Sequence, residues 1–155
     1  MNLFMNKIPH YKIAKEFLFE NNDHAIVGSS MNPMLKNGQK IEIAPVNCPL
    51  VIGHVYIFSL EGKLIMHRLI DIHGETAIFM GDFSFAIEKV PVNQVIGALR
   101  CQYHAFSLLL INAINRVCYK ACRLKRLHGI VQSFRITVIN TFSGVFENER
   151  KICKT

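Results

Sequence analysis

The stretch His54–Met80 reads HVYIFSLEGKLIMHRLIDIHGETAIFM, and it decides the fold. Two apolar runs flank Glu61-Gly62, which is typical of a tight hairpin turn, and His73-Gly74-Glu75 turns the chain again. Short strands at such spacing, with no helix between them, predict a mainly β protein built as a small coiled sheet or a partly open barrel. The expected strands are Lys40–Ala44, His54–Leu60, Lys63–Ile72, Thr76–Met80 and Val92–Leu99.

Helical periodicity flanks this strand region. Tyr11–Glu20 places apolar residues at helical spacing, which predicts a short N-terminal helix. Residues 106 to about 131 combine an apolar stripe with basic residues around the rest of the circumference, which predicts a basic amphipathic helix. Further on, Ser133–Asn140 is a candidate edge strand. The expected organisation is an N-terminal helical segment (1–24), a strand-rich domain (25–103) and a basic C-terminal extension (104–155).

The positive charge belongs to the extension. At 155 residues the chain is long enough for one domain with a real core, and its net charge is +7. Residues 1–99 hold eight Lys/Arg and nine Asp/Glu, a balance of −1, whereas residues 100–155 hold ten and two, a balance of +8. The helix at 106–131 is therefore expected to lie on an anionic membrane surface, to bind an acidic partner, or simply to pack on the body. Nucleic acid is not expected, because no helix-turn-helix pattern is visible and few aromatics accompany the cations.

The five cysteines are odd in number and irregularly spaced, which favours a reducing, cytoplasmic compartment. No apolar signal-peptide core is visible near the N-terminus, and the most apolar run, Ala105–Ile114, is too short to span a bilayer. Cys118 and Cys122 can share a helix face near His104 or His128, but no second paired motif accompanies them. We therefore expect small buried side chains there, and no metal or other cofactor.

A serine on a glycine-rich turn is the first candidate for chemistry. Gly28-Ser29-Ser30-Met31-Asn32-Pro33 can place Ser30 on a constrained bend, because Gly28 is free to adopt unusual backbone angles and Pro33 stiffens the exit. Such a turn can also direct the Ser30 backbone N–H at a developing oxyanion, and it makes Ser29, Met31 and Pro33 candidate oxyanion or substrate contacts. The alternative is an ordinary turn, since these are the residues of which turns are made.

His67 is the candidate base for that serine. Serine is a poor nucleophile unless a neighbouring group accepts its proton, and a neutral imidazole suits that task. The alternative is a structural histidine bonded to a backbone carbonyl, because His67 shares a strand face with Ile65 and Leu69. A third group would orient the imidazole. Asp82 and Glu88 follow the next strand, and the residues themselves leave the choice between them open.

The order of these pieces resembles the signal peptidase I family and its relatives among the self-cleaving repressor-type peptidases. The resemblance covers residues 25 to 100 and implies a serine peptidase. The matching segments are Gly28–Leu35 (Gly-x-Ser-Met-x-Pro-x-Leu), Gly53–Phe58 (Gly-x-Val-x-x-Phe), His67-Arg68, Gly81-Asp82 and Val95–Gly97 (Val-x-Gly).

The resemblance implies Ser30 as nucleophile and His67 as base. Most bacterial members carry lysine at the base position, whereas the endoplasmic-reticulum and archaeal type carries histidine followed by arginine, as this chain does. The acid of that branch lies several residues after the Gly-Asp pair, which favours Glu88, although Asp82 is the better-matched residue. This chain departs from the family at Gln39 and His54, where an acidic residue usually follows glycine, and these two are expected to shape turns.

The resulting expectation is a serine endopeptidase that removes a leader or signal segment from a peptide or precursor protein. An extended substrate would pair with an exposed strand edge, either 54–60 or the segment near Met31, with small side chains next to the cut. Two alternatives are a catalytically inactive peptide-binding module of the same fold and a self-cleaving repressor-type regulator. The regulator would need its own cleavage loop upstream of Ser30, where only 29 residues stand.

Overall fold

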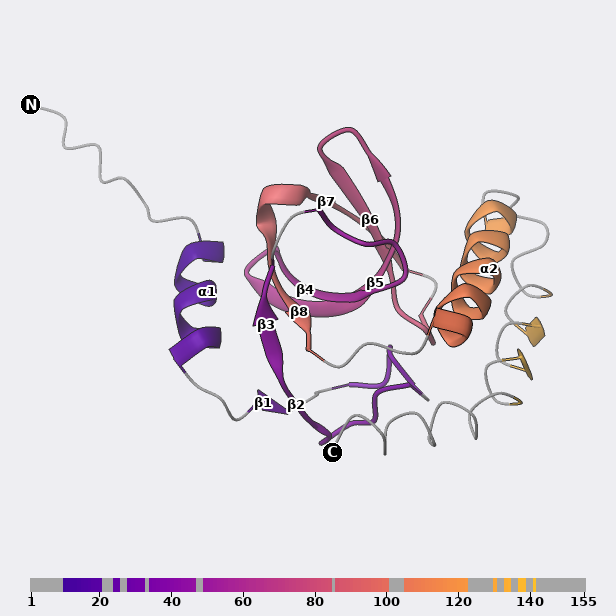
Figure 1. The fold of residues 1–155 in the computed structure, drawn as a ribbon, viewed down its shortest axis with the longest axis horizontal. Helices are drawn as coiled ribbons and strands as arrows, with labels where there is room; N and C mark the ends of the chain where they lie inside the picture. The colour runs from indigo at the N-terminus through magenta and orange to yellow at the C-terminus, as the bar shows by residue number, and fades with distance from the viewer. Residues whose placement is uncertain are drawn as a thin grey trace, which may run out of the picture.

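A computed structural model gives the structure of the protein (Figure 1). It describes residues 10–20, 24–25, 28–32, 34–46, 49–84, 86–100 and 105–122, together with 130, 133–134, 137–138 and 141.

The fold is mainly β, as expected, and its centre is one six-stranded sheet. The strand order is β3-β8-β4-β5-β6-β7, and every neighbouring pair is antiparallel. The sheet is coiled and not closed into a barrel, since β3 and β7 form its two outer strands. A separate two-stranded pair joins β1 to β2. The strands are β1 (His24–Ala25), β2 (Lys40–Ile41), β3 (Ile43–Pro45), β4 (Val55–Leu60), β5 (Lys63–His73), β6 (Thr76–Met80), β7 (Ile87–Pro91) and β8 (Val95–Leu99).

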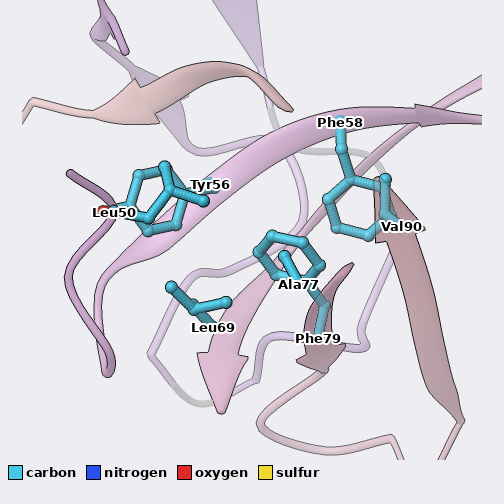
Figure 2. Packing of buried hydrophobic residues seen from close by; sticks show 7 residues of the cluster. All are labelled: Leu50, Tyr56, Phe58, Leu69, Ala77, Phe79 and Val90. Carbon is cyan, nitrogen blue, oxygen red and sulfur yellow. The ribbon is translucent and has the colours of Figure 1, made fainter. Parts of the chain in front are cut away.

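The concave side of the sheet holds the main core (Figure 2). Phe58 of β4 and Phe79 of β6 stack with their ring centroids 4.4 Å apart, and Tyr56 meets Phe79 edge-on. Leu69 and Val90 close the same cluster. Full burial of one such apolar side chain stabilises a fold by about 1.5–3 kcal/mol, so this cluster fixes the inner strands relative to one another.

Two helices flank the sheet on opposite sides in the view of Figure 1. Helix α1 (His10–Glu20) packs through Leu18 against Ile57 and Ile96. Helix α2 (Ala105–Cys122) packs through Cys118 and Tyr119 against β5 and β6. Helix α2 also buries Asn115, whereas Ile13 and Phe17 of α1 are more than half exposed. Among the described residues, no helix combines the length and the apolar character that crossing a bilayer requires.

Most expected elements are present, and several differ. The predicted strand Lys40–Ala44 is divided into β2 and β3, which belong to different sheets, and β1 has no counterpart in the prediction. The hairpin at Glu61-Gly62, the turn at Gly74 and both helix starts agree with the sequence to within one residue, although positions 123–129 of the long helix lie outside the described residues. The last strand begins at Val95, because Val92–Gln94 forms a 3₁₀ turn.

Strand β7 has no counterpart in the sequence prediction. It is short and ends in proline, a residue that weakens the strand signal and that sheets accept mainly in outer strands such as this one. Ser133, Phe134, Thr137 and Val138 are helical, so the predicted edge strand is wrong at those positions.

Candidate active site

Hydrogen bonds and one buried side chain hold the turn that carries Ser30. Gly28 has a φ of 112°, a left-handed conformation that favours glycine, and its N–H donates to Asn37 Oδ1 at 3.0 Å. The Asn32 N–H closes the turn by donating to the Ser29 carbonyl at 3.0 Å. Met31 is only 2% exposed and packs in a small cluster under the turn. Gly28 therefore adopts the unusual backbone angles that the sequence predicts, and the buried Met31 side chain anchors the turn.

Three side chains form a continuous chain of hydrogen bonds at this turn. His67 Nε2 lies 2.9 Å from Ser30 Oγ, and His67 Nδ1 lies 2.9 Å from Glu88 Oε2. The ionised carboxylate can only accept, so Nδ1 carries the proton and Nε2 is left to accept from the serine hydroxyl. This arrangement is the hydrogen-bonding order of a serine nucleophile, a base and an orienting acid.

Strand pairing places the imidazole. His67 lies on β5 opposite Tyr56 of β4, and its ring meets Phe58 edge-on at a centroid distance of 6.4 Å. Glu88 lies on β7, opposite Phe79 of β6, so the acid and the base are held two strands apart in the same sheet. The side chains of His67 and Glu88 are 6% and 11% exposed, which protects their bond from water.

Gly81 gives Ser30 and His67 room to meet. A Cβ at this position would lie 2.7 Å from the Ser30 carbonyl oxygen and 2.9 Å from His67 Nε2, both closer than real Cβ contacts allow. Two residues later, the Phe83 N–H donates to the same Ser30 carbonyl at 2.7 Å. The segment after β6 therefore holds the backbone of Ser30 directly.

Asp82 does not contact His67. Its carboxylate accepts from Arg68 Nε at 2.8 Å and from Arg68 Nη2 at 2.6 Å, and Arg68 Nη1 donates to the Gly53 carbonyl at 2.5 Å. Arg68 is 0% and Asp82 2% exposed, so each charge depends on the other. Of the two candidate acids, Glu88 takes the place beside the base, and Asp82 is a structural partner of Arg68.

The remaining sequence candidates are placed as follows. Ser29 is exposed next to Ser30, and its role as an oxyanion or substrate contact stays a prediction. Met31 is buried in the cluster under the turn, and its part in oxyanion or substrate binding stays a prediction. Pro33 lies outside the described residues. Strand β4 pairs with both β5 and β8, so the expected docking edge at 54–60 is wrong.

The cysteine and histidine candidates on the C-terminal helix are only partly described. Cys118 is buried against β5 and β6, while His104, His128 and the side chain of Cys122 lie outside the described residues.

The two departures from the resembled family do shape turns. Gln39 closes the bend that follows Lys36, through its N–H to the Lys36 carbonyl and through its Oε1, which accepts from the Lys36 N–H. The His54 N–H donates to the Val51 carbonyl at 3.2 Å, and its ring stacks on Tyr56. Burial lowers the pKa of His54 below its ordinary value of 6.5, and the positive charge of Arg68 lowers it further.

His54 makes the folded protein sensitive to acid. Because its pKa is lowered on folding, the unfolded chain takes up a proton that the folded chain resists, so stability falls as the pH drops below about 6.5. Urea unfolding at several pH values should show this loss in the unaltered protein and less of it in His54→Gln. An unchanged pH dependence in His54→Gln would contradict the assignment.

Sequence reasoning missed the partners of Arg68 and the role of Gly81. A signal for the first was present, because adjacent strand residues face opposite sides of a sheet. If His67 faces the site, Arg68 must point the other way, into a region where a charge needs a partner. No signal in the sequence identified Gly53 as the acceptor.

No protein-family model matches this chain, and a search of curated proteins finds no match either.

Proposed function

We propose that the protein is a serine endopeptidase. The observation that carries the proposal is the Ser30–His67–Glu88 chain, in which both hydrogen bonds measure 2.9 Å and the base and acid are largely buried. A structural histidine would need neither a serine hydroxyl on one nitrogen nor a carboxylate on the other. The constrained turn under Ser30 and the room left by Gly81 further support a nucleophile held for attack.

In the proposed mechanism Ser30 Oγ attacks the scissile carbonyl carbon while His67 Nε2 takes the hydroxyl proton. Glu88 holds the Nδ1 proton and stabilises the imidazolium that forms. The Ser30 backbone N–H donates to the oxyanion of the tetrahedral intermediate. His67 then delivers its proton to the leaving amine, which leaves Ser30 as an acyl-enzyme. In the second half of the reaction His67 Nε2 takes a proton from the attacking water and returns it to Ser30 Oγ as the acyl bond breaks.

The proposed substrate is an extended leader or signal segment of a peptide or precursor protein. With β4 paired on both sides, the docking edge is assigned to the segment around Gly28 and Ser29, both of which are exposed beside the nucleophile. Phe83, whose N–H holds the Ser30 carbonyl, is 43% exposed and offers an apolar surface next to the cut.

We also propose a peripheral contact between α2 and an anionic membrane. Arg116 and Lys120 are exposed on the helix, and Val117 between them is 60% exposed. Each cation near such a surface contributes on the order of 1 kcal/mol, enough for reversible attachment. This contact would bring the peptidase close to leader segments on a membrane surface.

A peptide library tests the proposed activity. Purified protein is incubated with diverse peptides and the products are read by mass spectrometry, beside Ser30→Ala and a matched serine variant, Ser59→Ala. Ser59 is a buried serine of β4 that pairs with Leu64, three residues from His67 along β5, so it is not a member of the Ser30–His67–Glu88 chain. The proposal expects cleavage by the unaltered protein and Ser59→Ala and none by Ser30→Ala. Equal products in all three, or none in any, would contradict it.

Gly81→Ala is expected to slow peptide cleavage by about 10²-fold, because the added methyl pushes the Ser30 backbone and the His67 ring out of alignment. Steady-state kinetics on a library substrate measure the loss. Gly74→Ala is the control: it strains the turn between β5 and β6, where Gly74 has a φ of 57°, but no atom lies within 4 Å of its added methyl, so it affects backbone stability without acting on the site. A Gly81→Ala protein that cleaves as fast as the Gly74→Ala protein would refute the steric argument.

A further inference from the structure

Helix α2 covers the side of the sheet on which Arg68 lies. Ile70, Ile78 and Met80 of β5 and β6 pack there against Cys118 and Tyr119. Along β5 successive side chains point to opposite faces, and Met80 pairs directly with Arg68 across the two strands. The helix and the catalytic histidine therefore lie on opposite faces of the same strand.

Asn112 is the point where α2 meets the loop before β4. Its Nδ2 donates to the Ile52 carbonyl at 3.3 Å. Its amide also lies directly over Gly53, because a Cβ at Gly53 would come within 2.3 Å of both Asn112 Nδ2 and Oδ1. Gly53 has a φ of 94°, so glycine suits this position for its backbone conformation as well as for the close contact. The amide thus fixes the loop by packing and by hydrogen bonding.

Hydrogen bonds through Arg68 and Asp82 connect the loop before β4 to the segment that holds Ser30. The Gly53 carbonyl accepts from Arg68 Nη1, and Arg68 holds both oxygens of Asp82. Asp82 lies between Gly81, which touches Ser30 and His67, and Phe83, whose N–H holds the Ser30 carbonyl. Arg68 is fully buried, so it cannot shift to a water partner when the loop moves.

We propose that Asn112 is a positioning residue of the active site, and that α2 sets the placement of Ser30 through the Gly53 carbonyl, Arg68 and Asp82. The inference rests on the proposed peptidase function. It gives the C-terminal extension a part in the chemistry that is separate from any membrane contact. A displaced Gly53 carbonyl would let the Arg68–Asp82 pair and the Phe83 N–H move, and small misplacements of a nucleophile have large kinetic effects.

The test compares Asn112→Ala with Ile114→Ala in the full chain. Ile114 packs on the Ile70 cluster from the same helix, so its replacement removes packing under α2 and keeps the Asn112 amide that contacts the loop. Three quantities are measured: the rate at which a fluorophosphonate modifies Ser30, the hydrogen exchange of the Phe83 amide, and the thermal midpoint. Asn112→Leu, which keeps the volume and lacks the donor, serves if the alanine variant does not fold.

We expect Asn112→Ala to slow modification of Ser30 by about tenfold or more and to speed exchange at Phe83. Ile114→Ala should lower the thermal midpoint and leave both other readouts unchanged. Unchanged readouts in Asn112→Ala, or losses that follow the thermal midpoint equally in both variants, would overturn the inference. If the unaltered protein is not modified at all, the peptidase proposal fails, and exchange at Phe83 alone decides whether Asn112 positions the Ser30 backbone.

Discussion

His67→Ala is expected to lower kcat/KM for peptide cleavage by about 10²–10⁴-fold, the usual contribution of general acid–base catalysis. The imidazole touches both Ser30 Oγ and Glu88 Oε2 at 2.9 Å, and no other histidine nitrogen is seen there among the described residues. Without it the hydroxyl keeps its proton, and the leaving amine has no acid. Steady-state kinetics on a substrate from the peptide library measure the effect.

His73→Ala provides the matched control. His73 lies at the far end of the same strand, and its side chain is 60% exposed. Its removal should leave both cleavage and folding unchanged. A His67→Ala protein that cleaved as fast as His73→Ala would show that His67 is a structural histidine and would remove the base from the proposed mechanism.

Asp82→Ala is expected to lower the free energy of unfolding by about 3–5 kcal/mol, the usual effect of breaking a buried ion pair by removing one partner. Arg68 is 0% exposed and would keep its charge without the two hydrogen bonds that Asp82 accepts. Urea unfolding measures the loss. Asp82→Asn retains one acceptor oxygen, so its free energy of unfolding should lie between those of the unaltered protein and Asp82→Ala. It replaces the alanine variant if that variant does not fold.

Glu88→Ala separates the two acids. Glu88 accepts from His67 and is more exposed than Asp82. Its removal should therefore lower the free energy of unfolding less, and the rate of cleavage more, than the removal of Asp82. The expected pattern is a large stability loss for Asp82→Ala and a large fall in kcat for Glu88→Ala. The reverse pattern would make Asp82 the orienting acid and contradict the geometry.

The local strand pattern was strong enough to predict the centre of the fold. Apolar runs on both sides of Glu61-Gly62 leave few alternatives to a hairpin, and β4 and β5 agree with the prediction to within one residue. The encounter of Ser30 with His67 could only be proposed, because residues far apart in sequence meet through strand pairing that no local pattern encodes. Its support in the sequence is the order of motifs, which resembles that of the signal peptidase I family.

The parts that sequence reasoning missed depend on long-range contacts. Strand β7 is held by its pairing with β6, and its own residues, including Glu88 and Pro91, carry little strand signal. The choice between Asp82 and Glu88 follows from that pairing, because β7 turns Glu88 toward His67 while the bend after β6 turns Asp82 toward Arg68. Asn112 gave no signal at all, since an asparagine on an amphipathic helix is unremarkable until its neighbour Gly53 is known.

Covalent modification tests whether Ser30 is an activated nucleophile. The intact protein is treated with a fluorophosphonate, and its mass and the modified peptide are determined beside Ser30→Ala, His67→Ala and Ser59→Ala. The account predicts one adduct, on Ser30, that is absent from Ser30→Ala, strongly slowed in His67→Ala and unchanged in Ser59→Ala. No adduct on the unaltered protein, or equal labelling of the Ser30→Ala variant, would contradict it.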